Sequence, residues 1–265
     1  MELVFFAYVH CVRCGLVQIN PQPDSEAVAF RYNKNHGDDY LKYELANEKV
    51  FLRLQELALK DAGFYLLEQK LLPPNVRAGL AGAGEAPRVL DIGCATGALL
   101  ASLQNSGWNA RGVEISGPQA AYCRKQGLDV SALPLEENHF PDSTFDVVLA
   151  SHVIEHLNSP FGFALEVKRV LKPGGHFFVT TPNISGFQAQ HFGSAWRSAI
   201  FDHLYLFSQK TLRMLLEKAG FGIERVKTWG GLAEGSAPPL RKKIMDRLAK
   251  PFAFGDVMIV RAIAK

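Results

Sequence analysis

The chain lacks most of the features that would assign it to a specialised class of protein. It has four cysteines in 265 residues, too few for a disulfide framework in a chain of this length. Its net charge of +3 is too small to indicate nucleic-acid binding by itself. The N-terminus shows no basic segment and no small-residue cleavage site, so we expect no signal peptide and a cytoplasmic location.

Long hydrophobic runs are also missing. The longest near the N-terminus, residues 3–9, is far short of the ~20 residues that cross a bilayer, so we expect no transmembrane segment. Hydrophobic residues make up 48% of the chain and charged residues 21%, as is ordinary for a globular protein. The length allows one large domain with appendages, or two small domains.

The most informative stretch that is present is RVLDIGCATGALLASL, residues 88–103. The apolar run before its first glycine is typical of a strand buried on both faces of a parallel sheet. Gly93 and Gly97 predict a tight turn, where a side chain would keep a ligand away from the backbone. Leucines at helical spacing follow, so the stretch predicts a strand, a turn and a helix whose N-terminus offers free N–H groups.

The acid Asp91, two residues before the first glycine, limits the ligands that this turn suits. A dinucleotide-binding turn has the pattern G-x-G-x-x-G and holds a pyrophosphate at the helix N-terminus. Here the spacing is Gly93-x-Ala95-x-Gly97. A carboxylate would repel a pyrophosphate and would suit a ligand that carries an ammonium and a sulfonium. A nicotinamide (NAD)-dependent oxidoreductase is therefore a disfavoured alternative.

The segment VLDIGCATG resembles motif I of the class I S-adenosylmethionine (SAM)-dependent methyltransferases, with Ala95 in place of the middle glycine. The block LKPGGHFFVTTPN resembles their strand-5 region. The resemblance covers roughly residues 85–230 and is to bacterial members of the methyltransferase-23/type-11 kind. It implies SAM as the cofactor, S-adenosylhomocysteine as the product, and a Rossmann-like α/β fold with a doubly wound, seven-stranded, mostly parallel sheet.

The alternation of strand and helix patterns also predicts a parallel sheet. We expect its strands near residues 88–92, 111–115, 129–132, 145–151, 176–181, 221–228 and 256–264. In this interpretation residues 85–265 form the SAM-binding core, with a lid insertion at about 182–207. Residues 38–84 form a helical cap and linker, and residues 1–37 form an N-terminal hairpin.

The hairpin carries a C-x-x-C-G turn at Cys11 and Cys14, which is one half of a zinc ribbon. The run CVRCGLVQINPQP also resembles a segment that precedes the catalytic domain in many bacterial methyltransferases, where a second C-x-x-C comes first. That second pair is absent here, so this segment alone cannot supply four thiolates. His10 or His36 would have to complete a mixed site, and we expect a hairpin without metal.

Polar residues at the ends of the expected strands are candidates for holding the cofactor. Glu114 lies about twenty residues beyond the glycine turn, where an acid accepts hydrogen bonds from ribose hydroxyls. The acid that binds adenine in many relatives is missing unless Glu136 or Glu137 reaches back, so we expect backbone groups near Ala132 and Leu133 to hold the base. Ligands of open α/β sheets lie beyond the carboxyl ends of strands, which brings in Ser151 and His152. The expected cofactor-binding residues are Asp91, Gly93, Cys94, Ala95, Gly97, Glu114, Ile115, Ala132, Leu133, Ser151 and His152.

A possible metal site follows the fourth expected strand. The pattern His152-x-x-Glu155-His156 resembles an E-x-x-E-H segment that binds a divalent metal in one ubiquinone-pathway branch. The first carboxylate is lost here. Histidine and glutamate both ligate metals, but we expect a structural Glu–His pair and no metal.

The insertion at about 182–207 separates the expected strand 176–181 from the helix that follows it. It is far longer than the usual ~2–6 residues, and long loops at this edge carry function. It resembles segments of methyltransferases found among sugar- and lipid-modifying enzymes. We place Asn183, Trp196 and Asp202 over the acceptor, and the resemblance adds Tyr40 and Tyr43 from the N-terminal helix.

The predicted reaction is O-methylation of a small-molecule, saccharide or lipid-linked acceptor, and N- or C-methylation is an alternative. A hydroxyl acceptor must lose its proton to a base with a pKa near neutrality. His203 is the first candidate and His152 the second. A SAM-binding protein without catalysis also stays open. Residues 240–252 predict a basic amphipathic helix, with either a solvated cationic face or a weak contact with an anionic membrane surface. We expect no nucleic-acid partner, and the sequence sets no oligomeric state.

Overall fold

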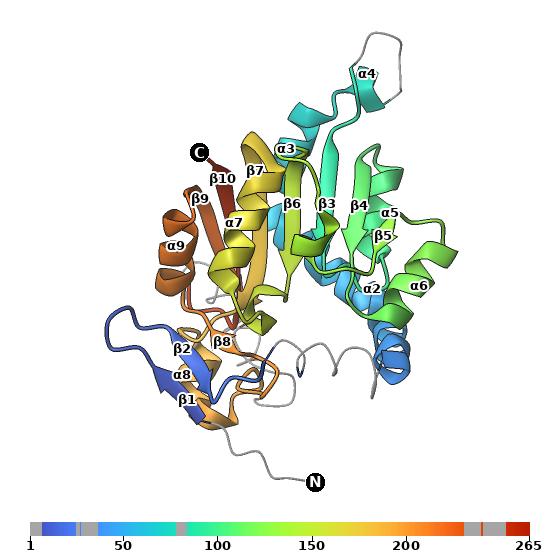
Figure 1. Ribbon diagram of the computed structural model, residues 1–265. Coiled ribbons are helices and arrows are strands. Elements are labelled where there is room, and N and C mark those ends of the chain that lie inside the picture. Colours follow the sequence, from blue (N-terminus) through green and yellow to red (C-terminus); the bar gives the residue numbers. More distant parts are fainter. Residues whose placement is uncertain (1–6, 25–26, 28–36, 78–83, 231–239, 241–252) are drawn as a thin grey trace.

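A seven-stranded sheet forms the centre of the computed structural model, which describes residues 7–24, 27, 37–77, 84–230, 240 and 253–265 (Figure 1). The strand order is β5-β4-β3-β6-β7-β10-β9. The five strands from β5 to β7 pair in parallel, and β10 is antiparallel to both of its neighbours. The strands are β3 (Arg88–Ile92), β4 (Asn109–Val113), β5 (Val130–Ser131), β6 (Phe145–Ser151), β7 (Leu171–Pro182), β9 (Phe221–Trp229) and β10 (Val257–Ala264).

This confirms the doubly wound, mostly parallel sheet. The chain leaves β3 toward β4 on one side and later returns to its other side as β6. Such a reversal opens a crevice at the carboxyl ends of the central strands. The expected bounds are close for most strands, but β7 begins at Leu171 instead of residue 176, because its first residue already pairs with Phe145 of β6.

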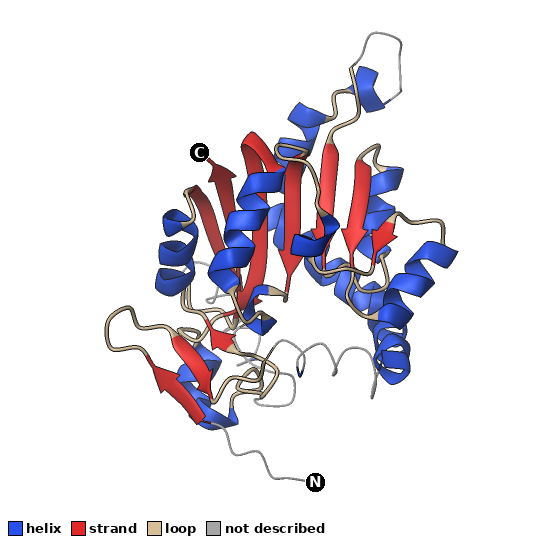
Figure 2. Cartoon of the chain, viewed as in Figure 1, coloured by secondary structure: helices blue, strands red, loops and turns tan. Residues whose placement is uncertain are grey.

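Helices cover both faces of the sheet (Figure 2). The side chains of β3 alternate between two cores: Leu90 packs with α7 and α9, and Val89 packs with α2, α3, α5 and α6. The helices are α2 (Gly37–Ala62), α3 (Phe64–Leu71), α4 (Pro74–Arg77), α5 (Ala98–Asn105), α6 (Gly117–Lys125), α7 (Pro160–Val170) and α9 (Gln209–Lys218). Gly63, at φ 83°, separates α2 from α3 as expected.

Three serines stand where the sequence pattern predicts a helix cap, and two of them form one. Ser159 accepts a hydrogen bond from the Gly162 amide, and Ser208 forms a reciprocal capping box with Thr211. The pattern Ser116-x-x-Gln119 predicts a capping box as well, and that prediction is wrong. The Ser116 amide that Gln119 would bind donates instead to Glu114 Oε1, at 2.8 Å.

The insertion after β7 is structured, with α8 (Phe187–Phe192), the short helix η4 (Gly193–Ala195) and strand β8 (Tyr205–Leu206). The N-terminal hairpin consists of β1 (Ala7–His10) and β2 (Val17–Asn20), and β8 pairs with β2 to form a second sheet of order β1-β2-β8. The hairpin and the insertion, which are distant in the sequence, therefore form one unit. Two further short helices are η2 (Leu135–Asn138) and η3 (Ile154–His156).

No helix within the described ranges is both long enough and apolar enough to cross a membrane. The basic helix expected at 240–252 lies, apart from Leu240, outside the described residues, as does His36.

The thiols of Cys11 and Cys14 are both free, at the tip of the hairpin. The Gly15 amide donates to the Cys11 carbonyl at 2.8 Å, which closes the turn through its backbone. We predict no stoichiometric zinc, and elemental analysis of purified protein checks this. One zinc per chain that disappears in a Cys11→Ser/Cys14→Ser variant would show that the hairpin is a metal site.

Candidate functional site

A cavity of about 1290 Å³ opens at the carboxyl edge of the sheet. Residues that follow β3, β4, β6 and β7 line it, together with α2 and the stretch 197–203 of the insertion. Small-molecule sites usually measure about 300–1,000 Å³. The cavity is therefore large enough to hold a cofactor and a second reactant together.

The glycine turn after β3 forms part of the wall, through Gly93 and Ala95. Gly93 has φ 73°, and a Cβ there would lie 2.5 Å from Val153 Cγ2. A Cβ on Gly97, at φ 78°, would lie 2.4 Å from Leu128 Cδ1. The backbone conformation and the packing within the protein therefore favour glycine at both positions, in addition to the approach of a ligand that the motif predicts.

Two of the expected cofactor residues support this turn from behind. Cys94 is buried and contacts the Cys123 thiol, and neither Cys94 nor Gly97 lines the cavity. Both residues therefore contribute to the shape of the turn and not to the surface of the cavity.

Glu114, directly after β4, lines the cavity beside Ile115. Its Oε1 accepts from the Ser116 amide at 2.8 Å, and its Oε2 accepts from the Ala95 amide at 3.0 Å. Burial raises the pKa of Glu114, against the opposite effect of these two hydrogen bonds. Each carboxylate oxygen has a second lone pair, so the anchored carboxylate can still accept hydrogen bonds from a diol.

Gln119 was not among the expected cofactor residues, yet it lines the cavity from α6. Its Nε2 is buried and has no hydrogen-bond partner among the described residues. Because Nε2 has no accessible surface, other atoms of Gln119 form its part of the cavity wall. The sequence contained a misleading signal here, since Gln119 completed an apparent capping box.

We expected Ala132 and Leu133 to line the cavity, but the residues that line it lie slightly further along the chain. Neither residue lines the cavity, whereas Pro134, Leu135 and Glu136 do. Leu133 is exposed, and its amide points back to Ser131 Oγ at 3.3 Å. The short strand β5 ends at Ser131, and the chain reaches the cavity only at the start of η2.

Asp91 is buried in β3 and lies beside the large cavity rather than in its wall. It lines a smaller cavity of about 20 Å³, which shares Ser151 and Thr180 with the large one. Burial, and then the nearby charge of Glu114, raise the pKa of Asp91 to about 7. A cationic group bound at this position would restore the charged form of the carboxylate.

After β6, His152 forms a pair with Glu155. The His152 backbone has φ 55°, a left-handed conformation that is uncommon for residues other than glycine. The Nδ1 of its ring lies 3.0 Å from Glu155 Oε1, and Thr181 Oγ1 donates to Glu155 Oε2 at 3.0 Å. Burial alone would raise the pKa of Glu155, but the His152 hydrogen bond and three neighbouring histidines lower it to about 2. The carboxylate is therefore ionised and fixes one nitrogen of a ring that faces the cavity.

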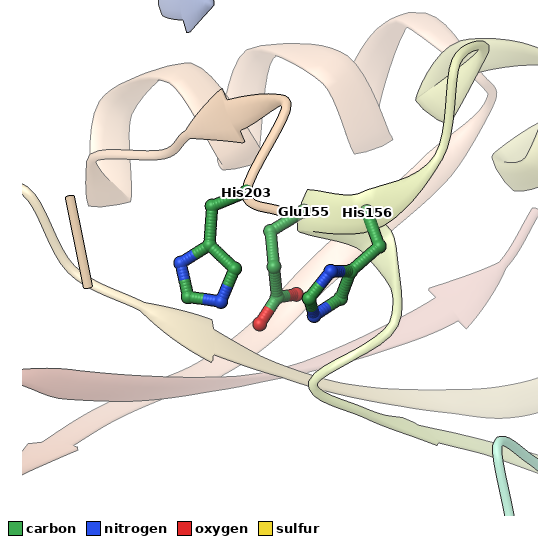
Figure 3. Close-up of side chains that lie close together, drawn as sticks. All are labelled: Glu155, His156 and His203. Carbon is green, nitrogen blue, oxygen red and sulfur yellow. The ribbon is translucent and has the colours of Figure 1, made fainter. Parts of the chain in front are cut away.

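Two more imidazoles converge on Glu155 (Figure 3). Glu155 and His156 project from η3, and His203 projects from the loop that leads to β8. His156 Nδ1 lies 2.8 Å from the Asp202 carbonyl, and His203 Nδ1 lies 2.8 Å from the Ser198 carbonyl. A carbonyl can only accept, so both Nδ1 atoms carry hydrogen. In the neutral form the Nε2 atom of each ring is then the basic one.

Glu155, His156 and His203 each offer one ligand atom, and these atoms lie within 4.8 Å of one another. This donor set of two nitrogens and one oxygen could hold a divalent ion. Both Glu155 oxygens already have protein partners, His152 and Thr181. The expectation of a structural pair without metal stays a prediction.

The residues placed over the acceptor from sequence divide into two groups. Tyr40, Tyr43 and Asp202 line the cavity, as does His203. Asn183 and Trp196 do not, which corrects their expected position. The Asn183 amide donates to the Gly255 carbonyl, and Trp196 Nε1 donates to the buried carboxylate of Asp256, so both residues fasten the insertion to the C-terminal part of the sheet.

Trp229 and Arg197 are two of the lining residues that the sequence analysis did not name. Trp229 ends β9, so the rule that ligands lie beyond strand ends was a sufficient signal for it. Arg197 contacts Asp256 with Nε at 2.8 Å and Nη2 at 2.7 Å, and no local pattern predicts that pairing.

Comparisons with known proteins agree with this geometry. A family model described as "Methyltransferase domain" matches residues 49–226. A "Ubiquinone biosynthesis O-methyltransferase" of Methylococcus capsulatus is 32% identical over 105 residues, 37% of this chain and 44% of that protein. A "Probable S-adenosylmethionine-dependent methyltransferase" of Mycolicibacterium smegmatis is 33% identical over 140 residues, 51% of this chain and 52% of that protein. The matches thus span about half the length of these relatives.

Solved structures show the same fold. A SAM-dependent methyltransferase from Archaeoglobus fulgidus has a TM-score of 0.53 and 20% identity, covering 76% of this chain and 99% of that one. A Thermotoga maritima enzyme titled a possible histamine N-methyltransferase has a TM-score of 0.52 and 23% identity, covering 83% and 98%. The family model matches well over half of the chain, so the protein belongs to the methyltransferase-domain family of class I SAM-dependent methyltransferases.

Proposed function

We propose that the protein transfers the methyl group of SAM to a hydroxyl oxygen of a small molecule, which includes saccharide and lipid-linked acceptors. The observation that carries this proposal is the presence, in one cavity, of the glycine turn with Glu114 and of imidazoles whose basic nitrogen is set by hydrogen bonds. The names of the curated relatives support oxygen as the acceptor atom.

SAM, when bound, supplies an already activated methyl group. Glu114 would accept hydrogen bonds from its ribose hydroxyls. Asp91 would attract its ammonium through the smaller cavity. Holding both reactants in line supplies much of the rate enhancement of a displacement reaction.

The hydroxyl acceptor must also lose a proton. The sequence ranked His203 above His152, but two contacts support the reverse order. Glu155 holds His152 Nδ1 at 3.0 Å and, as a buried anion, stabilises the imidazolium that forms when Nε2 takes the proton. Burial lowers the pKa of His203, which makes its protonation less favourable. We therefore assign the base role to His152 and a place in the acceptor wall to His203.

A labelled-methyl assay tests the proposal. Tritiated SAM would be incubated with a catechol, a hexose, a polyprenylated phenol and a primary amine as separate acceptors. We expect label in an ether product of at least one hydroxylated acceptor. Transfer to the amine alone would contradict O-methylation, and binding of SAM without transfer to any of the four would favour the non-catalytic alternative.

The pKa of Asp91 predicts a pH-dependent affinity for S-adenosylhomocysteine, which keeps the amino group of SAM. With the pKa at about 7, roughly a tenth of Asp91 is ionised at pH 6 and nine tenths at pH 8. Only the ionised form attracts the ammonium, so we expect the dissociation constant to be about tenfold higher at pH 6 than at pH 8. Calorimetry at both pH values checks this. The Asp91→Asn variant should bind weakly with little pH dependence, and an equally steep profile in that variant would assign the effect to another group.

A further inference from the structure

The N-terminal hairpin contacts the stretch that carries His203. Strand β2 pairs with β8 through Val17 with Leu206 and Gln18 with Tyr205. The Ile19 amide extends this pairing by donating to the Leu204 carbonyl at 2.9 Å. The family model begins at residue 49, so the whole hairpin lies outside the part of the chain that the family shares.

The side chain of Tyr8, in β1, contacts the backbone of the turn formed by residues 200–203. Its hydroxyl lies 2.6 Å from the Ile200 carbonyl and 2.9 Å from the His203 carbonyl. The His203 amide donates to the same Ile200 carbonyl at 3.0 Å. One phenol therefore contacts both ends of the turn 200–203. Burial and the neighbouring charge of Asp202 raise the pKa of Tyr8 to about 12, so the hydroxyl keeps its proton at neutral pH.

All four residues of this turn, 200–203, line the cavity. A second contact holds the turn from η3, where His156 Nδ1 donates to the Asp202 carbonyl. The place of the His203 ring in the wall thus depends on a backbone that Tyr8 and His156 hold from two different elements. The contact from His156 lies within the region that the family model matches, and the contact from Tyr8 lies outside it.

We infer that Tyr8 is a positioning residue of the acceptor site, and that the hairpin is a working part of that site rather than a separate appendage. This inference rests on the proposed function. The simpler reading is that the hairpin only covers apolar surface, because Tyr8 and Val17 also pack against Ala189, Trp196 and Leu206. The two readings differ in what the Tyr8 hydroxyl does, since the ring alone suffices for packing.

Tyr8→Phe removes the hydroxyl and keeps the ring. With the hydroxylated acceptor that the wild type methylates best, we expect kcat/KM for the acceptor to fall about 10- to 100-fold, as for a displaced catalytic geometry. The dissociation constant for S-adenosylhomocysteine should stay within twofold. Tyr65→Phe is the matched control, because Tyr65 is a partly buried tyrosine of α3 that does not line the cavity. It should leave both quantities within twofold.

An acceptor-independent measurement separates this inference from the proposed function. In wild-type protein the imidazole ¹⁵N shifts of His203 should report a single tautomer with hydrogen on Nδ1, as its contact with the Ser198 carbonyl requires. In Tyr8→Phe they should move toward a mixture of tautomers. Unchanged His203 shifts with unchanged kcat/KM would overturn the inference, as would a parallel loss of S-adenosylhomocysteine affinity. If the wild type methylates no hydroxylated acceptor, the proposed function fails, and the ¹⁵N shifts alone decide the role of Tyr8.

Discussion

Replacing His152 with alanine is expected to lower kcat by about 10²- to 10⁴-fold, the usual contribution of a positioned general base. The reason is the Glu155 contact, which fixes Nδ1 of His152 and leaves Nε2 facing a cavity that the cofactor turn also lines. Cofactor affinity should change much less, because Glu114 and the glycine turn are untouched. The measurement is methyl transfer at saturating SAM with the acceptor identified by the labelled-methyl assay.

His191→Ala is the matched control for this prediction. His191 lies on α8, stacks on Phe187 and does not line the cavity, so its loss should leave kcat within about twofold. Glu155→Gln tests the same pair from the other side. It removes the charge that stabilises the imidazolium, and we expect it to lower kcat, as His152→Ala does. A His152→Ala variant with wild-type kcat would remove His152 from the mechanism and return His203 to first place.

Replacing Glu114 with alanine is expected to weaken S-adenosylhomocysteine binding by about 1.5–3 kcal/mol, or roughly 10- to 150-fold, which is typical of lost hydrogen bonds to a charged acceptor. The side chain is fixed in the cavity wall by the Ala95 and Ser116 amides, so the change also frees the turn that it anchors. Calorimetry gives the dissociation constant, and a melting curve verifies that the variant is folded.

Glu137→Ala is the control for Glu114→Ala. Glu137 is an exposed acid of η2 that does not line the cavity. We expect its removal to change the dissociation constant less than threefold. Equal effects of the two substitutions would mean that negative charge near the cavity matters, and not the anchored carboxylate.

The parts of the fold that local sequence determines could be predicted. The buried strand at Arg88–Ile92, the glycine turn after it and the caps at Ser159 and Ser208 depend on neighbouring residues alone. Glu114 could be predicted for the same reason, because the end of a strand places it. These local rules located one side of the cavity within a few residues.

The features that the sequence did not predict depend on contacts between segments that are distant along the chain. Asn183 and Trp196 are polar or aromatic residues on an insertion, which is a common signature of an acceptor site. Their partners Gly255 and Asp256 lie some distance along the chain, just before β10, and no local pattern connects the two segments. The pairing of β2 with β8 is equally non-local, so the hairpin was interpreted as a separate appendage.

We propose that the cavity binds SAM through the turn at Gly93 and the carboxylate of Glu114. The most direct measurement is calorimetry at pH 8 with S-adenosylhomocysteine and NAD as separate titrants. We predict that S-adenosylhomocysteine binds at one site per chain and that this binding is weakened in Glu114→Ala, while NAD gives no binding signal. Binding of NAD without binding of S-adenosylhomocysteine would contradict the claim.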